Sequence, residues 1–182
     1  MDTHTQKGVF CDDTTEVVEL QDMLDRRETR QLQQQTLLAH QSGVLLSFAL
    51  NIPGPIKTSI LLHKLFQEAL ELIKETLERE KISIVNDIVV HEKTGDEYIA
   101  LLKGEAYRIK ELMCNIEETH ACGRLFDIDV IDEQGCKLSR KTYRRCLLCD
   151  HQAQDCPRNR THSVDELCDA ISILVSHHLN DL

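Results

Sequence analysis

The sequence predicts a single α+β domain with a ferredoxin-like core, and three observations support this fold class. The 182 residues are 41% apolar, which is enough to bury one sizeable core. Helical and strand patterns alternate along the middle of the chain in the order β-α-β-β-α-β, the split order of a ferredoxin-like sandwich. Turn residues separate these patterns. We therefore expect one domain at residues 14–182, preceded by a polar, flexible N-terminus at residues 1–13.

The first half of the chain is expected to hold an added N-terminal helix, then the first strand and helix of the core. Residues 15–41 are rich in Leu, Gln, Glu and Arg, which favour helix, and Gly43 ends this pattern. Residues 44–52 are mostly apolar and stop at Pro53-Gly54-Pro55, which is typical of a strand. Residues 59–81 carry apolar side chains at helical spacing, so we expect a helix there that covers one face of the sheet. The other face is expected either to be covered by the N-terminal helix or to be used for binding.

The second half is expected to complete the core with a hairpin, a helix and a last strand. Residues 82–92 are rich in β-branched side chains, and Lys93-Thr94-Gly95-Asp96 is a hairpin signal that leads into a return strand at residues 97–102. The apolar spacing at residues 104–118 predicts a helix, and residues 125–131 alternate as a strand does.

A Cys/Arg-rich segment and a final helix are expected after the core. Residues 136–139 follow a turn and are predicted to form a short strand. Ser163-Val164-Asp165-Glu166 has the pattern of a capping box, in which Ser163 and Glu166 satisfy each other's backbone amides, so the last helix should begin there.

Asp127 and Asp129 are the strongest candidates for catalytic residues. Side chains two apart on a strand point to the same face, so these carboxylates should project together while Phe126, Ile128 and Val130 enter the core. Two adjacent carboxylates repel each other unless a cation lies between them, and Mg²⁺ is the ion that carboxylates and phosphate oxygens bind together. The pair predicts a Mg²⁺ site for phosphoryl or nucleotidyl transfer; the alternative is a solvated strand face.

A basic segment directly follows this strand. Residues 137–160 hold seven basic and two acidic residues and are therefore +5, in a chain whose net charge is −10. Arginine forks beside a carboxylate pair suit a polyphosphate ligand. The negative net charge of the chain and its few aromatic residues argue against an extended nucleic-acid-binding surface. We therefore expect a small anionic ligand.

Six motifs together resemble the citrate lyase holo-acyl-carrier-protein synthase family, the apo-citrate lyase phosphoribosyl-dephospho-CoA transferases. They span the chain from the strand-to-helix turn to the last helix: Asn51–Lys57, Ile116–His120, Gly123–Val130, Ser139-Arg140, Arg145–Cys149 and Cys156–Ser163. The similarity covers about residues 20–175. The loops differ from the family pattern at Ala121-Cys122 and at Pro157 and Asn159, but the arginines beside them are present.

The resemblance implies a reaction and a set of roles. The enzyme would transfer the phosphoribosyl-dephospho-CoA group from triphosphoribosyl-dephospho-CoA to a serine of the citrate lyase acyl-carrier (γ) subunit, releasing diphosphate. Asp127 and Asp129 would hold Mg²⁺ in a nucleotidyltransferase-like site, and Arg124 would stabilise the transferring phosphorus. The residues expected to grip the substrate are Lys57, Arg140, Arg145, Arg158 and Arg160. The base for the serine could be Asp127, Asp129, Glu118 or His120.

Two further groups carry open alternatives. Arg27 and Arg30 share a face of the N-terminal helix, which is either solvated or lies over the site, and the resemblance extends to them. The prolines of residues 51–57 either make a plain connection or stiffen a loop that holds Lys57 against a ligand.

Cys146, Cys149, Cys156 and His162 have the ligand types and spacing of a structural zinc site. The alternative is a set of small buried thiols with a histidine near a helix start. Because the N-terminus does not read as a signal peptide and no apolar run is long enough to span a bilayer, we expect a cytoplasmic protein without a membrane partner. In such a reducing compartment, the eight cysteines are expected to be thiols or metal ligands and not disulfides. The alternative function is a non-catalytic, zinc-stabilised binding module for citrate lyase subunits.

Overall fold

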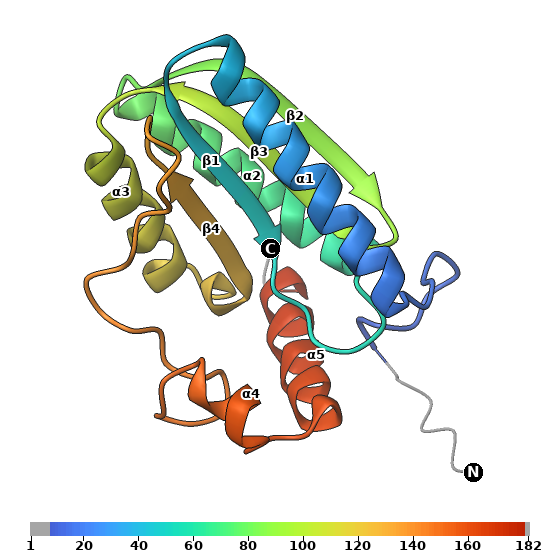
Figure 1. Ribbon diagram of the computed structural model, residues 1–182. Coiled ribbons are helices and arrows are strands. Elements are labelled where there is room, and N and C mark those ends of the chain that lie inside the picture. The colour runs from blue at the N-terminus through green and yellow to red at the C-terminus, as the bar shows by residue number, and fades with distance from the viewer. Residues whose placement is uncertain (1–7, 181–182) are drawn as a thin grey trace.

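The computed structural model describes residues 8–180, which fold into one four-stranded antiparallel sheet with helices on both faces (Figure 1). The sheet order is β2-β3-β1-β4. The strands are β1 (Val44–Leu50), β2 (Ser83–Glu92), β3 (Gly95–Lys103) and β4 (Phe126–Ile131). The helices are α1 (Leu20–His40), α2 (Ile60–Arg79), α3 (Ala106–Thr119), α4 (Asp155–Asn159) and α5 (Val164–Asn180), and a short 3₁₀ turn (Gly123–Leu125) precedes β4. The mixed α and β class is therefore confirmed, and so is the expected order of core elements.

The main core lies between the sheet and helices α2, α3 and α5. Alternate residues of β1 enter it, and Phe48 stacks on Phe66 of α2 with ring centroids 5.0 Å apart and meets Phe126 of β4 edge-on at 5.7 Å. Such aromatic pairs add to the free energy gained from area burial alone. The three rings join β1, α2 and β4, and thereby fix where β4 begins.

The opposite face of the sheet is covered by α1, whose apolar contact is small. Leu37 of α1 packs on Leu45 and Ile99 of the sheet. Further along the helix, Arg26 donates to Glu97 of β3 over 2.6 Å and Arg30 lies 2.7 Å from the same carboxylate, which is almost wholly buried. A charged triad therefore holds the first half of α1 on the sheet where apolar packing is thin.

Strand β4 lies at the edge of the sheet, and charged side chains of α3 pair with its outward backbone groups. The Nζ of Lys110 donates to the carbonyl of Ile128 over 2.9 Å, and Oε1 of Glu117 accepts from the amide of Ile128 over 3.0 Å. Lys110 and Glu117 are seven residues apart on one helix face, and both are buried. At Ile128 these two bonds replace those of a partner strand, and they hold β4 against α3.

Several predicted boundaries differ from the structure. The first helix begins at Leu20 rather than near residue 15, and residues 136–139 make a single bridge between Ile131 and Lys137 instead of a strand. Helix α4 was not predicted. The capping box is confirmed, since Ser163 and Glu166 exchange backbone and side-chain hydrogen bonds at the start of α5.

The predicted flexible N-terminus lies partly outside the described residues, which begin at residue 8. Val9 and Phe10 are 1% and 3% exposed and belong to the main core. Asp12 accepts the amide of Ile60 at the start of α2 over 2.8 Å. Residues 8–13 are thus part of the domain, because two apolar side chains anchor them. Within the described residues, no helix combines the length and apolarity needed to cross a bilayer.

Glu97→Gln should lower the free energy of unfolding by about 3 kcal/mol, because it removes the charge that compensates the buried guanidinium of Arg26. Urea unfolding followed by circular dichroism measures the change. Glu28→Gln, on the exposed side of the same helix, serves as the control and should stay within about 0.5 kcal/mol of the unsubstituted protein. Equal stability of the two variants would contradict the role assigned to the triad.

Candidate functional site

Asp127 and Asp129 project from the same face of β4, as the alternation predicts. In the register of β4 on β1, they lie opposite Ala49 and Ser47, while Phe126, Ile128 and Val130 are buried in the core. Helix α1 lies towards β3 and leaves β4 uncovered (Figure 1). The two carboxylates therefore open into a cavity of about 680 Å³, between β4 and the segment that follows it.

The two carboxylates differ in their surroundings. Oδ2 of Asp129 lies 2.5 Å from Nζ of Lys137, which lines the same cavity. The side chain of Asp127 is exposed to solvent and lines the cavity. Desolvation and, next, the negative charge of Asp129 raise the pKa of the Asp127 carboxyl. An ammonium group thus occupies one side of the pair, and the other carboxylate has no hydrogen-bonded cation among the described residues.

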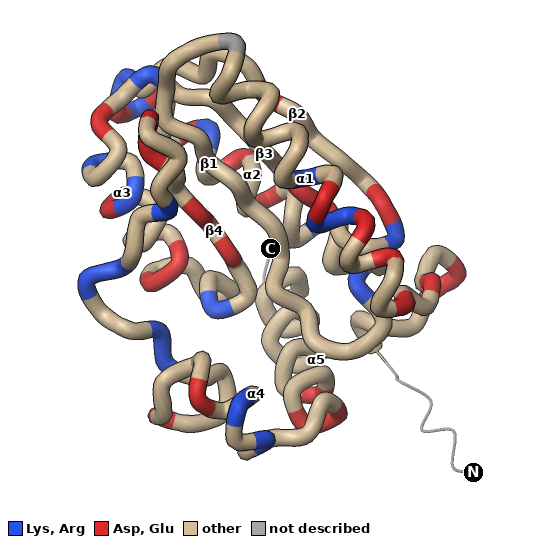
Figure 2. Tube along the Cα trace, viewed as in Figure 1, with Lys and Arg blue, Asp and Glu red and all other residues tan. Residues whose placement is uncertain are grey.

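Cationic side chains of the following segment close this cavity. Figure 2 shows basic positions along the segment that follows β4 and acidic positions on that strand. Arg140 lies 2.8 Å from Glu118 and 3.5 Å from Glu117, and its Nε contacts the sulfur of Cys114 at 3.4 Å. Both Arg140 and Arg144 line the cavity with the acid pair.

Arg144 ties the basic segment to the start of β4. Its guanidinium donates to the carbonyls of Gly123, at 3.1 Å, and Phe126, and it lies 3.7 Å from Oε1 of Glu117. Gly123 is required at this turn, because a Cβ there would lie 2.5 Å from the carbonyl oxygen of Glu117. The turn therefore packs directly on the end of α3, and Arg144 bridges it to the strand.

Glu117 is the buried anion of the site. Its side chain is 3% exposed, its Oε1 accepts the Ile128 amide, and its Oε2 has no hydrogen-bond donor among the described residues. Burial raises the pKa of the Glu117 carboxyl, although Arg144, the Ile128 amide, Arg140 and Lys110 act in the opposite direction. Sequence reasoning missed Glu117 and Lys110 as parts of the site. Glu117 lay within the motif Ile116–His120, and the signal for Lys110 was its seven-residue spacing from Glu117 on a helix beside the acidic strand.

Arg124 and two of the predicted substrate arginines line a second cavity, of about 660 Å³. Arg145 and Arg160 belong to this cavity and not to the one with the acid pair. Arg145 is exposed and pairs with Asp150 at 3.5 Å. Arg144, which was not predicted as a substrate residue, lines both cavities, so it lies beside the acid pair and Arg145 does not.

Two of the predicted base candidates do not line the cavity with the acid pair. His120 contacts Glu68 through Nε2 at 3.1 Å, accepts the Cys122 amide at Nδ1, and packs against the ring of His178. Glu118 is 57% exposed and pairs with Arg140. The aspartates are the predicted base candidates that line this cavity.

The remaining predicted substrate residues also lie apart from the acid pair. Lys57 donates to the carbonyl of Ile52 over 2.6 Å, and burial lowers the pKa of its amino group; it braces the proline turn. Arg30 is held by Glu97, whereas Arg27 and Arg158 are exposed. Arg26, which was not predicted, is the arginine of α1 that is buried.

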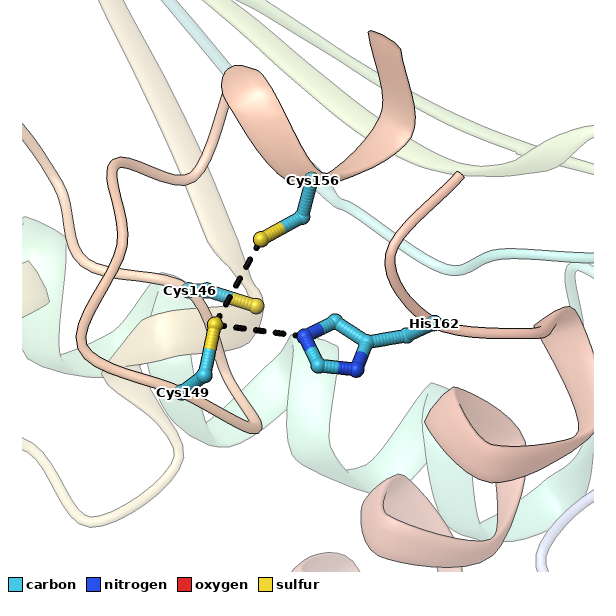
Figure 3. Close-up of side chains that lie close together, drawn as sticks. All are labelled: Cys146, Cys149, Cys156 and His162. Atoms are coloured by element: carbon cyan, nitrogen blue, oxygen red, sulfur yellow. Dashed lines mark hydrogen bonds between the residues drawn. The ribbon is translucent and has the colours of Figure 1, made fainter. Parts of the chain in front are cut away.

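Cys146, Cys149, Cys156 and His162 converge, as the zinc prediction requires. Their ligand atoms lie within 4.8 Å of one another, and Figure 3 shows the four side chains pointing toward a common centre. Cys149 Sγ lies 3.5 Å from Cys156 Sγ and 3.2 Å from Nε2 of His162. Burial disfavours the Cys146 thiolate, but the amides of Leu148 and Cys149 and the neighbouring thiols lower the pKa of Cys146 overall. The donor set therefore fits a tetrahedral Cys₃His zinc ion.

Comparison with known proteins gives a consistent result over most of the chain. The profile of the family described as apo-citrate lyase phosphoribosyl-dephospho-CoA transferase matches residues 18–178. The chain belongs to this family. A probable apo-citrate lyase phosphoribosyl-dephospho-CoA transferase of Streptococcus pyogenes is 36% identical over 182 residues, covering 94% of each chain.

Two other relatives extend the comparison. The apo-citrate lyase phosphoribosyl-dephospho-CoA transferase of Citrobacter koseri is 30% identical over 175 residues, covering 92% of this chain and 96% of its own. Protein CitXG of Haemophilus influenzae is 33% identical over 165 residues, which are 88% of this chain and 36% of that protein. The family match spans both cavities and the cysteine cluster.

Arg144→Lys should lower the free energy of unfolding by about 2 kcal/mol, because a lysine cannot bond the carbonyls of Gly123 and Phe126 while also facing Glu117. Arg145→Lys is the matched control, one residue away and exposed, and should melt like the unsubstituted protein. Differential scanning calorimetry measures both variants. If Arg144→Lys has a normal melting temperature, Arg144 does not hold the basic segment on β4.

Proposed function

We propose that this transferase takes the phosphoribosyl-dephospho-CoA group from triphosphoribosyl-dephospho-CoA and attaches it to a serine of the citrate lyase acyl-carrier (γ) subunit. The observation that carries the proposal is one cavity that holds Asp127 and Asp129 beside Lys137, Arg140 and Arg144, in a chain of the apo-citrate lyase phosphoribosyl-dephospho-CoA transferase family. A carboxylate pair next to guanidinium groups suits a triphosphate.

The bonds that change are few. The serine oxygen bonds to the phosphorus nearest the ribose, the bond from that phosphorus to the bridging oxygen of diphosphate breaks, and the serine proton passes to a base. Charge grows on the leaving diphosphate during this step. Arg140 and Arg144 are placed to stabilise that charge through hydrogen bonds that need no rearrangement.

Asp127 and Asp129 fit a Mg²⁺ ion. Both are oxygen donors on one strand face, and Asp129 already holds a cation, the ammonium of Lys137. When bound there, Mg²⁺ would orient the phosphate oxygens and neutralise part of their charge. Lys137, once released from Asp129, is within reach of a phosphate on the same side of the cavity.

The base is assigned to the acid pair. Glu118 and His120 are engaged outside the cavity, and Glu117 is too deeply buried to meet a serine of another protein. A raised pKa makes Asp127 a better proton acceptor than an ordinary aspartate, as long as it is ionised. We therefore assign proton removal to Asp127 and the closer metal contact to Asp129.

The fold supports this placement. The β-α-β-β-α-β order with sheet order β2-β3-β1-β4, all antiparallel, is consistent with a ferredoxin-like core. The acids lie on the sheet face away from α2 and α3, which resembles the open arrangement that a nucleotidyltransferase-like site needs. A large partner such as the γ subunit can then approach the cavity from solvent.

Zinc at Cys146, Cys149, Cys156 and His162 is proposed as a structural ion. Four protein ligands would close its coordination, so the ion would not take part in the transfer. It would instead fix the loop of residues 144–162, whose few regular elements are the short helix α4 and the bridge between Arg145 and Gln152. Arg144 and Arg160 are both carried by this loop.

The direct experiment is mass spectrometry of the apo γ subunit incubated with triphosphoribosyl-dephospho-CoA, Mg²⁺ and this protein. The γ subunit should gain the mass of one phosphoribosyl-dephospho-CoA group at a serine, with release of diphosphate. An unmodified γ subunit, together with zinc-loaded protein that still binds it, would instead support the non-catalytic binding module.

Asp127→Asn and Asp129→Asn should each reduce transfer by about 10²-fold or more, the scale of several kcal/mol of lost charge stabilisation. Both variants should melt normally, because neither side chain is in the core. Asp132→Asn, on the turn after β4, is the control and should keep full transfer. Near-normal turnover by either Asp127→Asn or Asp129→Asn would remove that residue from the site.

If the cysteine cluster binds zinc, the purified chain should contain about one zinc ion, and chelation should lower its melting temperature. Cys149→Ser should reduce the zinc content, whereas Cys136→Ser, at an exposed thiol outside the cluster, should not. Metal-free protein in which all four ligand groups titrate freely would end the zinc proposal and leave the transfer proposal intact.

A further inference from the structure

The second cavity, which we call the Leu167 cavity, differs in chemistry from the one that holds the acid pair. Leu125, Leu147, Val164 and Leu167 contribute to its walls together with Pro53. Among residues 8–180, no aspartate or glutamate lines it. Its volume of about 660 Å³ falls within the range of about 300–1,000 Å³ that is usual for small-molecule sites.

Arginines line this apolar cavity. Arg124, Arg145 and Arg160 take part in its wall. Arg124 has no carboxylate partner within residues 8–180, and both its partial burial and the charges of Arg144 and Arg140 lower the pKa of its guanidinium. A partly buried guanidinium without a carboxylate partner, under the charges of Arg144 and Arg140, is stabilised when an anion binds. The cavity thus combines an apolar wall with a place for a phosphate.

The two cavities adjoin. Asn51, Arg144, Ala153 and Pro157 line both of them. A ligand that extends from one to the other would pass Arg144, which is fixed by the carbonyls of Gly123 and Phe126. The proposed donor is long enough in principle to occupy two adjoining sites. It carries a triphosphate at one end, and at the other an adenosine diphosphate joined to a long, weakly polar pantetheine arm.

We propose that the Leu167 cavity binds the dephospho-CoA part of the donor, with its diphosphate on Arg124 and its pantetheine arm along Leu147, Val164 and Leu167. This inference rests on the proposed function for the identity of the ligand. It reassigns Arg124, Arg145 and Arg160 from the transferring phosphates to the dephospho-CoA part. Arg140 and Arg144 remain with the triphosphate. It also makes the loop of residues 144–162 part of the binding wall, since Cys146, Cys156 and His162 line the same cavity.

The test is calorimetric binding of dephospho-CoA to the full-length protein, purified with its metal, in the absence of added Mg²⁺. Val164→Trp fills the cavity from a half-exposed position at the start of α5, and should weaken binding by about tenfold or more. Ile173→Trp is the matched control on the same helix, 72% exposed and outside the cavity, and should bind normally. Asp127→Asn should also bind dephospho-CoA normally, because it contacts only the transferring end.

Arg124→Gln provides a second, independent variant. It should weaken binding of dephospho-CoA and of ADP, which both carry the diphosphate, and leave pantetheine binding unchanged. Melting curves establish that each variant is folded. Absence of dephospho-CoA binding to the unsubstituted protein, or equal affinity of the Val164→Trp and Ile173→Trp variants, would overturn the proposal.

The outcome separates this inference from the proposed function. If dephospho-CoA binds as expected but the γ subunit gains no mass, the cavity assignment stands and the transfer proposal fails. If the γ subunit is modified and Val164→Trp has an unchanged KM for the donor, the transfer proposal stands and the cavity assignment fails.

Discussion

The site depends on the contacts of one buried carboxylate, that of Glu117. It accepts the amide of Ile128 on β4, it lies within 3.7 Å of both Arg140 and Arg144, and it is almost completely buried. One helix residue therefore joins α3, the acidic strand and the basic segment. A buried carboxylate is costly unless it is paired, and the two arginines and the amide supply that pairing. In turn, Glu117 keeps these guanidiniums pointed into the cavity and away from bulk water, where they would be mobile.

A second buried carboxylate, Glu97, is paired with arginines on the face of the sheet that α1 covers. Glu97 on β3 and Asp127 on β4 lie in one row, on either side of Ala49, so about 10 Å of sheet separates their backbones. Glu97 is covered by α1 and neutralised by Arg26 and Arg30, whereas Asp127 is left open. Coverage by a helix thus distinguishes a structural carboxylate from one that is available for a ligand, although both occupy the same face of the same sheet.

Local patterns were sufficient to predict the elements of the core, the shared face of Asp127 and Asp129, the capping box at Ser163 and the convergence of the cysteines. Each depends on residues that are close in sequence. The long-range partners were not predictable in this way. Nothing near Arg144 or Arg145 indicates which one faces Glu117, and the pairing of His120 with Glu68 and His178 joins three distant elements. The short strand predicted at residues 136–139 was wrong because Lys110 and Glu117 already bond both backbone groups of Ile128. This segment therefore pairs only near the end of β4, where the amide of Leu138 donates to the carbonyl of Val130.

The central claim is that Asp127 and Asp129 hold a divalent cation against the donor's triphosphate. It is tested most directly by anomalous diffraction from crystals that contain Mn²⁺ and a non-hydrolysable donor analogue. The account predicts a manganese peak bound by both carboxylates, with Lys137 moved from Asp129 to a phosphate oxygen. A manganese ion and triphosphate bound elsewhere, with Lys137 still paired to Asp129, would contradict it.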